Sequence, residues 1–393
     1  MVRILKYAKG HVVLFIIVTY LAILKSYRKV PIIRIDRFLP DMRNILLWTK
    51  IHGLEGEGQK YFIDQKCAFI NCYFTTNKSL FGDLRYFDVI LFNLQDVSEG
   101  AYSLPELRSA SQKYIFVAND SSDNFPVCNP VFDVFFNWTW TYRFDSTISY
   151  RFITIYNTYY EELGSHFQWN YNMKPIEPSL KSQFVTKSKA AVIFLDKCKS
   201  RSKRENLIKD LQIDLAMYNL DVDVFGSCGP KQCKRKTMNP CFWRLRKTYF
   251  FYLAFEDSFD YDYITDIVLY AYNNNAVPIV YGGARYESYL PPGSYINALN
   301  TSTMALATSM HDIIKNKEKY YDFFRWKNHY TISKSPVLNA CALCEILNSP
   351  ARLVQNVVNS KFRMLSLCTC KQFAKFRGFD MEIESSVPMQ ITE

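Results

Sequence analysis

The sequence is poor in histidine, with five residues, and has neither a G-x-S-x-G elbow nor a recognisable cysteine–histidine signature. These absences argue against serine-hydrolase and cysteine-protease chemistry. G-x-G-x-x-G turns and Walker loops, which cradle phosphates in many proteins, are also missing. The net charge of +11 is spread along the chain without an arginine-rich block or zinc-finger spacing. We therefore expect no nucleic-acid partner, whereas anionic substrates such as nucleotide phosphates fit the charge.

The length of 393 residues predicts two domains, and the 49% hydrophobic content predicts packed cores. The segment 160–189 has little periodicity and contains Pro175 and Pro178, so we place the domain boundary there. The expected order is a cytoplasmic tail (1–9), a transmembrane signal-anchor (10–24), a stem (25–43), an N-terminal domain (44–175), a C-terminal domain (185–345) and a C-terminal extension of unknown role (346–393).

One long apolar run is present, "GHVVLFIIVTYLAIL" at 10–24, and its only ionisable side chain is that of His11. As a helix it would span roughly 22 Å, short of the ~30 Å hydrocarbon core, and flanking lysines and arginines that snorkel would make up the difference. The alternatives are a cleaved signal peptide and a buried helix. No small-x-small cleavage site follows Leu24, which disfavours the signal peptide. We expect a single-pass membrane anchor.

Eleven cysteines and four N-glycosylation sequons follow the apolar run. Close cysteine pairs are either zinc ligands or halves of disulfides, and disulfides in an oxidising compartment are favoured because CALC is the one zinc knuckle present. The odd count leaves at least one thiol free or intermolecular. The disulfide candidates are Cys67, Cys72, Cys228, Cys233, Cys341 and Cys344. The sequon asparagines are Asn77, Asn119, Asn137 and Asn300, which together with the anchor predict a lumenal body.

The C-terminal half alternates strand and helix patterns, which predicts βαβ units and a parallel sheet. Apolar runs predict strands at 190–196, 221–225, 249–255 and 276–282, and 204–218 reads as a helix with Leu207, Leu211 and Leu215 on one face. In the N-terminal half, 86–94 reads as a buried strand.

Ligands of such sheets bind beyond the carboxyl ends of the strands. Lys203 and Arg204 would open a helix there and oppose its dipole, which indicates a bound phosphate, the alternative being a solvated basic turn. In the second such stretch, "FYLAFEDSFDYDYITDI" (251–267), a strand ends in carboxylates and a helix is expected to begin near Asp262. Two DxD pairs, Asp221/Asp223 and Asp260/Asp262, are too unspecific to predict a metal site.

Several segments are similar to signatures of the α1,3/α1,4-fucosyltransferase family. The stretch 251–267 resembles FYLAFENS…DYITEK, "AVPIVYGGARYESYLPPGSYI" (276–296) resembles AVPVV.G…Y..FLPP…FI, and "FFNWTWTYRFDSTI" (135–148) resembles F-N-x-T-x-(S/T)-Y-R-x-D-S. Shorter matches in family order are ILLWT (45–49), VDVFGSCG (222–229), FFRWK (323–327) and CALC (341–344). The resemblance covers residues 44–345.

The resemblance implies a GT-B fold, that is, two Rossmann-like domains with the active site in the cleft between them. The N-terminal domain would be the acceptor side and the C-terminal domain would bind GDP-fucose. It also implies a type II Golgi membrane protein with a lumenal catalytic body. The reaction would be an inverting transfer of fucose from GDP-β-L-fucose to a glycan, α1,3 to N-acetylglucosamine. No cofactor would be required, and a divalent metal would at most stimulate.

By position in the family motifs, Arg204 matches the arginine that contacts the donor pyrophosphate and Tyr263 matches the tyrosine of DYITEK. The donor-binding candidates are Arg204, Glu256, Asp257, Tyr263 and Asp266. Three positions depart from the family: Asp257 replaces an asparagine, Asp266 a glutamate and Ile267 a lysine. Losing the charge-assisted contact of that lysine would cost roughly 1.5–3 kcal/mol in donor binding.

The family's catalytic glutamate aligns with Asp120 of "YIFVANDSS", and Asp123 is the fallback base. Aspartate keeps the charge but shortens the reach by one methylene, which matters in positioned catalysis. The alternative is that both residues belong to a solvated loop without a catalytic role. A glycan on Asn119 would crowd an active site at this position. The altered base and the three donor-site departures leave a second hypothesis, a family member without turnover that acts as a binding or regulatory partner.

Overall fold

The chain folds into two compact units, which are described separately. The computed structural model describes residues 32–33, 41–54, 56–100, 102–126, 132, 135–164, 167–233, 238–335 and 338–349. Among these residues, the first unit takes those up to 117, those from 132 to 139 and those from 340 onward, and the second takes 118–126 and 140–339. No helix within the described ranges is long and apolar enough to cross a membrane. The predicted anchor (10–24) lies outside the described residues, as do the tail (1–9) and residues 350–393.

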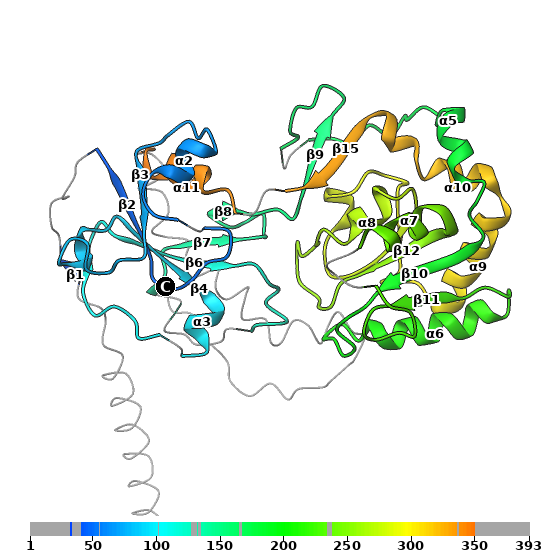
Figure 1. Ribbon diagram of the computed structural model, residues 1–393, viewed down its shortest axis with the longest axis horizontal. Coiled ribbons are helices and arrows are strands. Elements are labelled where there is room, and N and C mark those ends of the chain that lie inside the picture. Colours follow the sequence, from blue (N-terminus) through cyan, green and yellow to red (C-terminus); the bar gives the residue numbers. More distant parts are fainter. Residues whose placement is uncertain are drawn as a thin grey trace, which may run out of the picture. The chain divides into compact units, whose positions relative to one another are not determined.

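The first unit contains a parallel sheet in which β3, β2, β4 and β6 are neighbours in that order (Figure 1). Its elements are β1 (Ile32–Ile33), β2 (Arg43–Leu47), α2 (Lys60–Asp64), β3 (Cys72–Thr75), η1 (Leu84–Tyr86), β4 (Val89–Asn93), α3 (Leu94–Ser98), β5 (Arg108–Ser109), β6 (Lys113–Ala118), β7 (Trp138–Thr141) and α11 (Ala340–Leu347). The strand predicted over 86–94 is confirmed as β4, whose first four residues are buried on both faces, as expected of an inner parallel strand.

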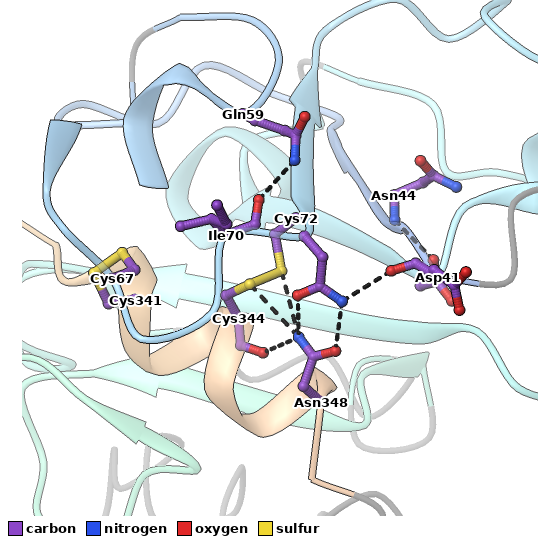
Figure 2. The surroundings of a disulfide bond; sticks show 11 residues. Asp41, Asn44, Gln59, Cys67, Ile70, Cys72, Cys341, Cys344 and Asn348 are labelled. Carbon is purple, nitrogen blue, oxygen red and sulfur yellow. Dashed lines mark hydrogen bonds between the residues drawn. A yellow bond between two sulfur atoms is a disulfide. The ribbon is translucent and has the colours of Figure 1, made fainter. Parts of the chain in front are cut away.

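Two disulfides fasten helix α11 to this unit (Figure 2). Cys67 bonds to Cys341, and Cys72, at the start of β3, bonds to Cys344. Next to the second disulfide, the side-chain amides of Asn71 and Asn348 bond reciprocally at 2.8 and 3.0 Å. A helix that follows the whole second unit in the sequence is therefore part of the first.

The second unit contains a five-stranded sheet of order β11-β10-β12-β13-β14 in which every pair is parallel. Its elements are β8 (Ile148–Ser149), β9 (Ile153–Asn157), α5 (Pro178–Lys181), η2 (Ser182–Phe184), β10 (Lys189–Phe194), α6 (Arg204–Ala216), β11 (Val222–Phe225), α7 (Asn239–Thr248), β12 (Tyr249–Phe255), α8 (Val268–Tyr272), β13 (Val277–Tyr281), η4 (Tyr286–Ser288), β14 (Ile296–Asn297), α9 (Thr303–Lys315), α10 (Lys317–Asp322), η5 (Arg325–Asn328) and β15 (Tyr330–Lys334).

The strand order of this sheet reverses between β10 and β12, because the chain leaves β10 toward β11 on one side and later returns to β12 on the other. In doubly wound sheets such a reversal opens a crevice beyond the carboxyl ends of the two strands. The strands predicted from 190–196, 221–225, 249–255 and 276–282 are all confirmed.

The period of two along β12 divides the core of this unit into two layers. Phe251, Leu253 and Phe255 pack on the side covered by α6, α9 and α10. Tyr252 and Ala254 pack on the opposite side, with residues of α7 and α8. The sheet is thus covered on both faces, which is what a parallel sheet requires.

Three details of the helices differ from the expectations. Helix α6 buries Ile208 with Leu211 and Leu215, and Leu207 is only half-buried. The helix expected near Asp262 begins at Val268, and Asp262 itself adopts a left-handed backbone with φ of 61°, which an α-helix cannot include. Helix α7 was not predicted.

Candidate active site

A cavity of about 270 Å³ lies at the reversal of the second sheet, beyond the carboxyl ends of β10 and β12. The polar side chains that line it include those of Asp196, Lys197, Arg204, Glu256, Asp257, Tyr263 and Thr265. Four of the five predicted donor-binding residues are among them. Three of these seven polar residues come from the loop and helix after β10, and the other four come from the segment that links β12 to α8.

Arg204 is the first residue of α6, and Lys203 before it adopts a left-handed backbone with φ of 55°. The Nη1 atom of Arg204 donates to the carbonyl of Phe255 at 2.5 Å, which fixes the guanidinium against the end of β12. Its Nε is buried and has no hydrogen-bond partner among the described residues. A buried unpaired donor of a charged group is costly, so Arg204, which lines the cavity, is suited to a ligand that brings a hydrogen-bond acceptor.

Glu256 is buried, and its carboxyl group accepts hydrogen bonds from the Thr265 backbone nitrogen at 2.7 Å and from the Thr265 hydroxyl at 2.9 Å. Burial raises the pKa of Glu256 to about 8, against the opposing effects of these bonds and of the Arg204 charge. This residue is therefore largely a neutral acid at pH 7.

Asp257 forms an ion pair with Lys197, with 2.8 Å between Oδ2 and Nζ. Its Oδ1 accepts from the Asn124 side-chain amide at 3.0 Å and from the Ser258 hydroxyl at 3.1 Å. Burial alone would raise the pKa of Asp257, but the bonds from Lys197 and Asn124 bring it below its ordinary value. The carboxylate that replaces the family's asparagine is thus ionised and paired.

Asp120 lies in the loop after β6 and belongs with the second unit. Its Oδ1 accepts from the Ser121 nitrogen at 2.7 Å, the Asn124 amide at 2.8 Å and the Tyr263 hydroxyl at 3.3 Å. Among the residues that the structure describes, every hydrogen bond accepted by Asp120 goes to Oδ1 and none goes to Oδ2. The Tyr263 hydroxyl links Asp120 to the cavity that Tyr263 lines.

The ring of Tyr263 is held in place by Tyr142 and Phe152, whose ring centroids lie 5.0 and 5.8 Å away in edge contacts. Burial, with the nearby charges of Glu256 and Asp120, raises the pKa of Tyr263 well above its ordinary value. Tyr263 is therefore a neutral hydroxyl donor.

Asp123, the fallback base, has both carboxylate oxygens engaged in the fold. Oδ1 pairs with Arg201 at 3.0 Å, and Oδ2 accepts from the Phe259 nitrogen at 3.1 Å. Its side chain is buried, with 3% exposed. These bonds suit a residue that holds its loop rather than one that exchanges a proton with a substrate.

Asp266 does not line the cavity. Its carboxylate pairs with Lys334 of β15 at 2.7 Å and lines a separate groove with Trp243. Ile267, which replaces the family lysine, does line the cavity. In the DxD at 260–262, Asp260 is buried and accepts from the Ser122 nitrogen at 2.8 Å and from the Tyr142 hydroxyl.

Three residues that sequence reasoning missed take part in the site, namely Lys197, Asn124 and Thr265. Lys197 was visible as part of the basic loop at 196–204, but nothing in the sequence tells which of its cations reaches the cavity. Asn124 bonds across 133 positions to Asp257, and Thr265 bonds back nine positions to Glu256. Contacts of this kind leave no periodic signal.

Among the sequon asparagines, Asn77, Asn119 and Asn300 are exposed and Asn137 is half-buried. The Oδ1 atom of Asn137 accepts from the Tyr114 nitrogen at 2.8 Å and from the Arg108 guanidinium.

All six cysteine candidates form disulfides, and in each close pair the two members bond to different partners. Cys228 bonds to Cys198 and Cys233 to Cys241, in addition to the two bonds that hold α11.

Comparison with known proteins identifies two family models in the chain. Residues 184–361 match the model described as glycosyltransferase family 10 (fucosyltransferase), C-terminal, and residues 40–153 match the model of the fucosyltransferase N-terminal region. The α-(1,3)-fucosyltransferase C of Drosophila melanogaster is 28% identical over 329 residues, which are 80% of this chain and 76% of that protein. The human 4-galactosyl-N-acetylglucosaminide 3-α-L-fucosyltransferase 9 is 26% identical over 300 residues, 73% of this chain and 74% of that protein.

A crystal structure of an α1,3-fucosyltransferase with GDP-fucose aligns with 89% of this chain and 95% of its own, at 14% identity and a TM-score of 0.45. A TM-score below 0.5 does not by itself establish a common fold. The two family models together match most of the chain. The protein therefore belongs to the fucosyltransferases of glycosyltransferase family 10.

Proposed function

We propose that this protein transfers L-fucose from GDP-β-L-fucose to a glycan with inversion at the anomeric carbon, α1,3 to N-acetylglucosamine. Family membership supports the transfer of fucose. The names of the Drosophila and human relatives, an α-(1,3)-fucosyltransferase and a 3-α-L-fucosyltransferase of a galactosyl-N-acetylglucosaminide, support the linkage and the acceptor sugar.

The observation that carries the donor site is the buried, unpaired Nε of Arg204 at the cavity beyond β10 and β12. A diphosphate oxygen is an acceptor that would satisfy this atom, and the amides at the start of α6 add to the attraction for an anion. Because Glu256 is in its neutral acid form, it does not repel the negatively charged diphosphate. The Arg204 guanidinium would also stabilise the charge that develops on the leaving GDP.

The base would be Asp120. Its Oδ1 is held by Ser121, Asn124 and Tyr263, which leaves Oδ2 to take the proton of the attacking sugar hydroxyl. The hydroxyl oxygen forms a bond to the fucose anomeric carbon from the face opposite GDP, and the bond from that carbon to the phosphate oxygen breaks. The bonding electron pair leaves with GDP, so charge and atoms balance and the anomeric configuration inverts.

We further infer a GT-B arrangement, a type II single-pass anchor at 10–24 and a lumenal, Golgi-located catalytic body. The disulfides support an oxidising compartment. No cofactor is proposed beyond the GDP-fucose co-substrate. The Asp260 carboxylate, half of one DxD, is occupied by bonds from Ser122 and Tyr142, which does not favour a metal role for that pair.

Calorimetry of the full chain in detergent tests the donor site, with GDP-fucose as the ligand and GDP-mannose as the control. Selective micromolar binding of GDP-fucose is expected, and transfer to N-acetylglucosamine-containing oligosaccharides should accompany it. Absence of both from a folded sample would refute the proposal. Selective binding without transfer would instead favour a partner role for the protein.

A further inference from the structure

The loop between β10 and α6 carries several cations, and Lys197 is the lysine of this loop that lines the cavity. It faces the same space as Arg204 and Ile267. The family signature has a lysine at the position of Ile267, so the chain has an apolar residue there and a lysine elsewhere in the lining of the same cavity.

Lys197 is held by Asp257, the other departure from the family at this cavity. Their ion pair is 2.8 Å long, and the side chains are 52% and 21% exposed, respectively. Asp257 is itself fixed by Asn124 and Ser258. Because the lysine end of this pair is half exposed, solvent screens the interaction and its contribution to stability is small. The main effect of the ion pair is therefore to hold the Lys197 ammonium group at the cavity.

The loop that carries Lys197 is anchored at several points. The neighbouring Cys198 bonds to Cys228 in the loop after β11. Ser202 donates its backbone nitrogen to the Asp257 carbonyl at 3.0 Å and its hydroxyl to the Glu256 carbonyl at 2.7 Å. The lysine is thus presented from a preorganised loop, which reduces the entropy lost when it binds an anion.

We propose that Lys197 binds the diphosphate of the donor in this chain and replaces the cation that the family signature carries at the position of Ile267. Asp257 holds the ammonium at the cavity in the empty protein and shares it with a phosphate oxygen when the nucleotide is bound. This inference rests on the proposed function, because it assumes a nucleoside diphosphate in the cavity.

The competing explanation is that the Lys197–Asp257 pair only joins two loops. In that case removing the ammonium would alter stability slightly and leave nucleotide affinity unchanged. The two explanations also differ for a second-site change, because a lysine at position 267 can replace a lost phosphate contact but not a lost contact with Asp257.

The test is calorimetry of GDP binding to the full chain in detergent, with four forms compared: wild type, Lys197→Ala, Lys199→Ala, and Lys197→Ala combined with Ile267→Lys. Lys199 is the matched control, an exposed lysine two residues along the same loop. We expect Lys197→Ala to weaken GDP binding roughly 10- to 100-fold, as the loss of a charge-assisted hydrogen bond does. Lys199→Ala should bind like the wild type, and Ile267→Lys should recover most of the loss. Thermal unfolding of each variant verifies that it is folded.

Equal GDP affinity of wild type and Lys197→Ala would overturn this inference and leave the proposed function standing. A loss in Lys197→Ala that Lys199→Ala reproduces, or that Ile267→Lys does not recover, would also overturn it, because the effect would then be non-specific. A folded wild type that does not bind GDP would refute the proposed function, and this inference with it.

Discussion

Glu256 shows how one buried residue can make a site sensitive to pH. Its pKa of about 8 exceeds that of an ordinary carboxyl group because burial disfavours the charged form. Near pH 7 the group is mostly neutral, and above pH 8 it becomes a carboxylate that faces the cavity. A new negative charge beside a bound diphosphate opposes binding.

We therefore predict that GDP affinity falls as the pH rises from 7 to 9, and that Glu256→Gln removes most of this fall. The other groups that face Glu256 are Arg204, Asp257, Tyr263 and Tyr286. The lowered pKa of Asp257 and the strongly raised pKa values of the two tyrosines keep these three groups from changing charge in this range. Calorimetry at several pH values measures the effect. A wild-type profile retained by Glu256→Gln would assign the pH dependence to another group.

Asp120 and Asp123 are three residues apart and differ in their hydrogen bonding. Both carboxylate oxygens of Asp123 are bonded within the fold, whereas the bonds to Asp120 go to Oδ1. We predict that Asp120→Asn lowers the fucosyl-transfer rate by about 10²- to 10⁴-fold, the usual contribution of a general base, with GDP affinity nearly unchanged. Asp123→Asn should mainly lower thermal stability, because the buried Asp123 carboxylate accepts bonds from the Arg201 guanidinium and the Phe259 nitrogen that hold its loop. Rate measurements with saturating donor, together with melting curves, distinguish the two. An unchanged transfer rate in Asp120→Asn would exclude it as the base.

At the scale of elements, the link between β12 and α8 depends on a close backbone approach. Gly283 follows β13, and a Cβ atom there would lie 2.7 Å from the carbonyl oxygen and 2.8 Å from the nitrogen of Asp260. Only glycine lets the two segments touch, and their contact holds the carboxyl-end loop that carries Asp257 and Tyr263.

We predict that Gly283→Ala destabilises the protein by about 1–3 kcal/mol, as overpacking against backbone does. Gly164→Ala is the matched control, because a Cβ there meets nothing within 4 Å. Melting temperatures measure both changes. Equal stability of the two variants would mean that the loop after β12 moves aside without cost.

At the scale of the whole molecule, the chain returns to its first unit after completing the second, and α11 is held there by Cys67–Cys341 and Cys72–Cys344. These bonds close loops with sequence separations of 274 and 272 residues. Loop-closure entropy gives roughly 5 kcal/mol as the stabilisation from one such bond. The second bond closes little additional loop, because its ends are only a few residues from the first.

We therefore predict that replacing either cysteine pair by serine costs much less stability than replacing both. Urea unfolding of the two double variants and of the quadruple variant measures this. The serine variant of Cys198 and Cys228, in the second unit, is the control for loss of a disulfide with a short loop of 30 residues. Additive losses from the two pairs would show that each bond stabilises the fold by a separate local effect.

Local sequence patterns were sufficient to predict several strands and helices. The apolar runs predicted β4, β10, β12 and β13, because inner strands of a parallel sheet are buried on both faces, and a shorter run predicted the edge strand β11. The alternation with helices predicted the parallel sheet of the second unit, and the ordered motifs predicted the family. The sequence also predicted that Arg204 lies at the start of α6, where a cation opposes the helix dipole and therefore indicates an anion-binding site.

Tertiary structure alone decided what depends on contacts between distant residues. The start of α8 moved to Val268 because the preceding segment is held by the contact of Gly283 with Asp260 and by the bonds from Thr265 to Glu256. Contacts between distant residues also determine three other features. These are the disulfide partners, the inclusion of the Asp120 loop in the second unit, and the pairing of Lys197 with Asp257. The periodicity of apolar residues indicates which face of a helix or strand is buried. The features above depend instead on which helices, strands and loops contact one another. A single sequence carries no local signal of those contacts.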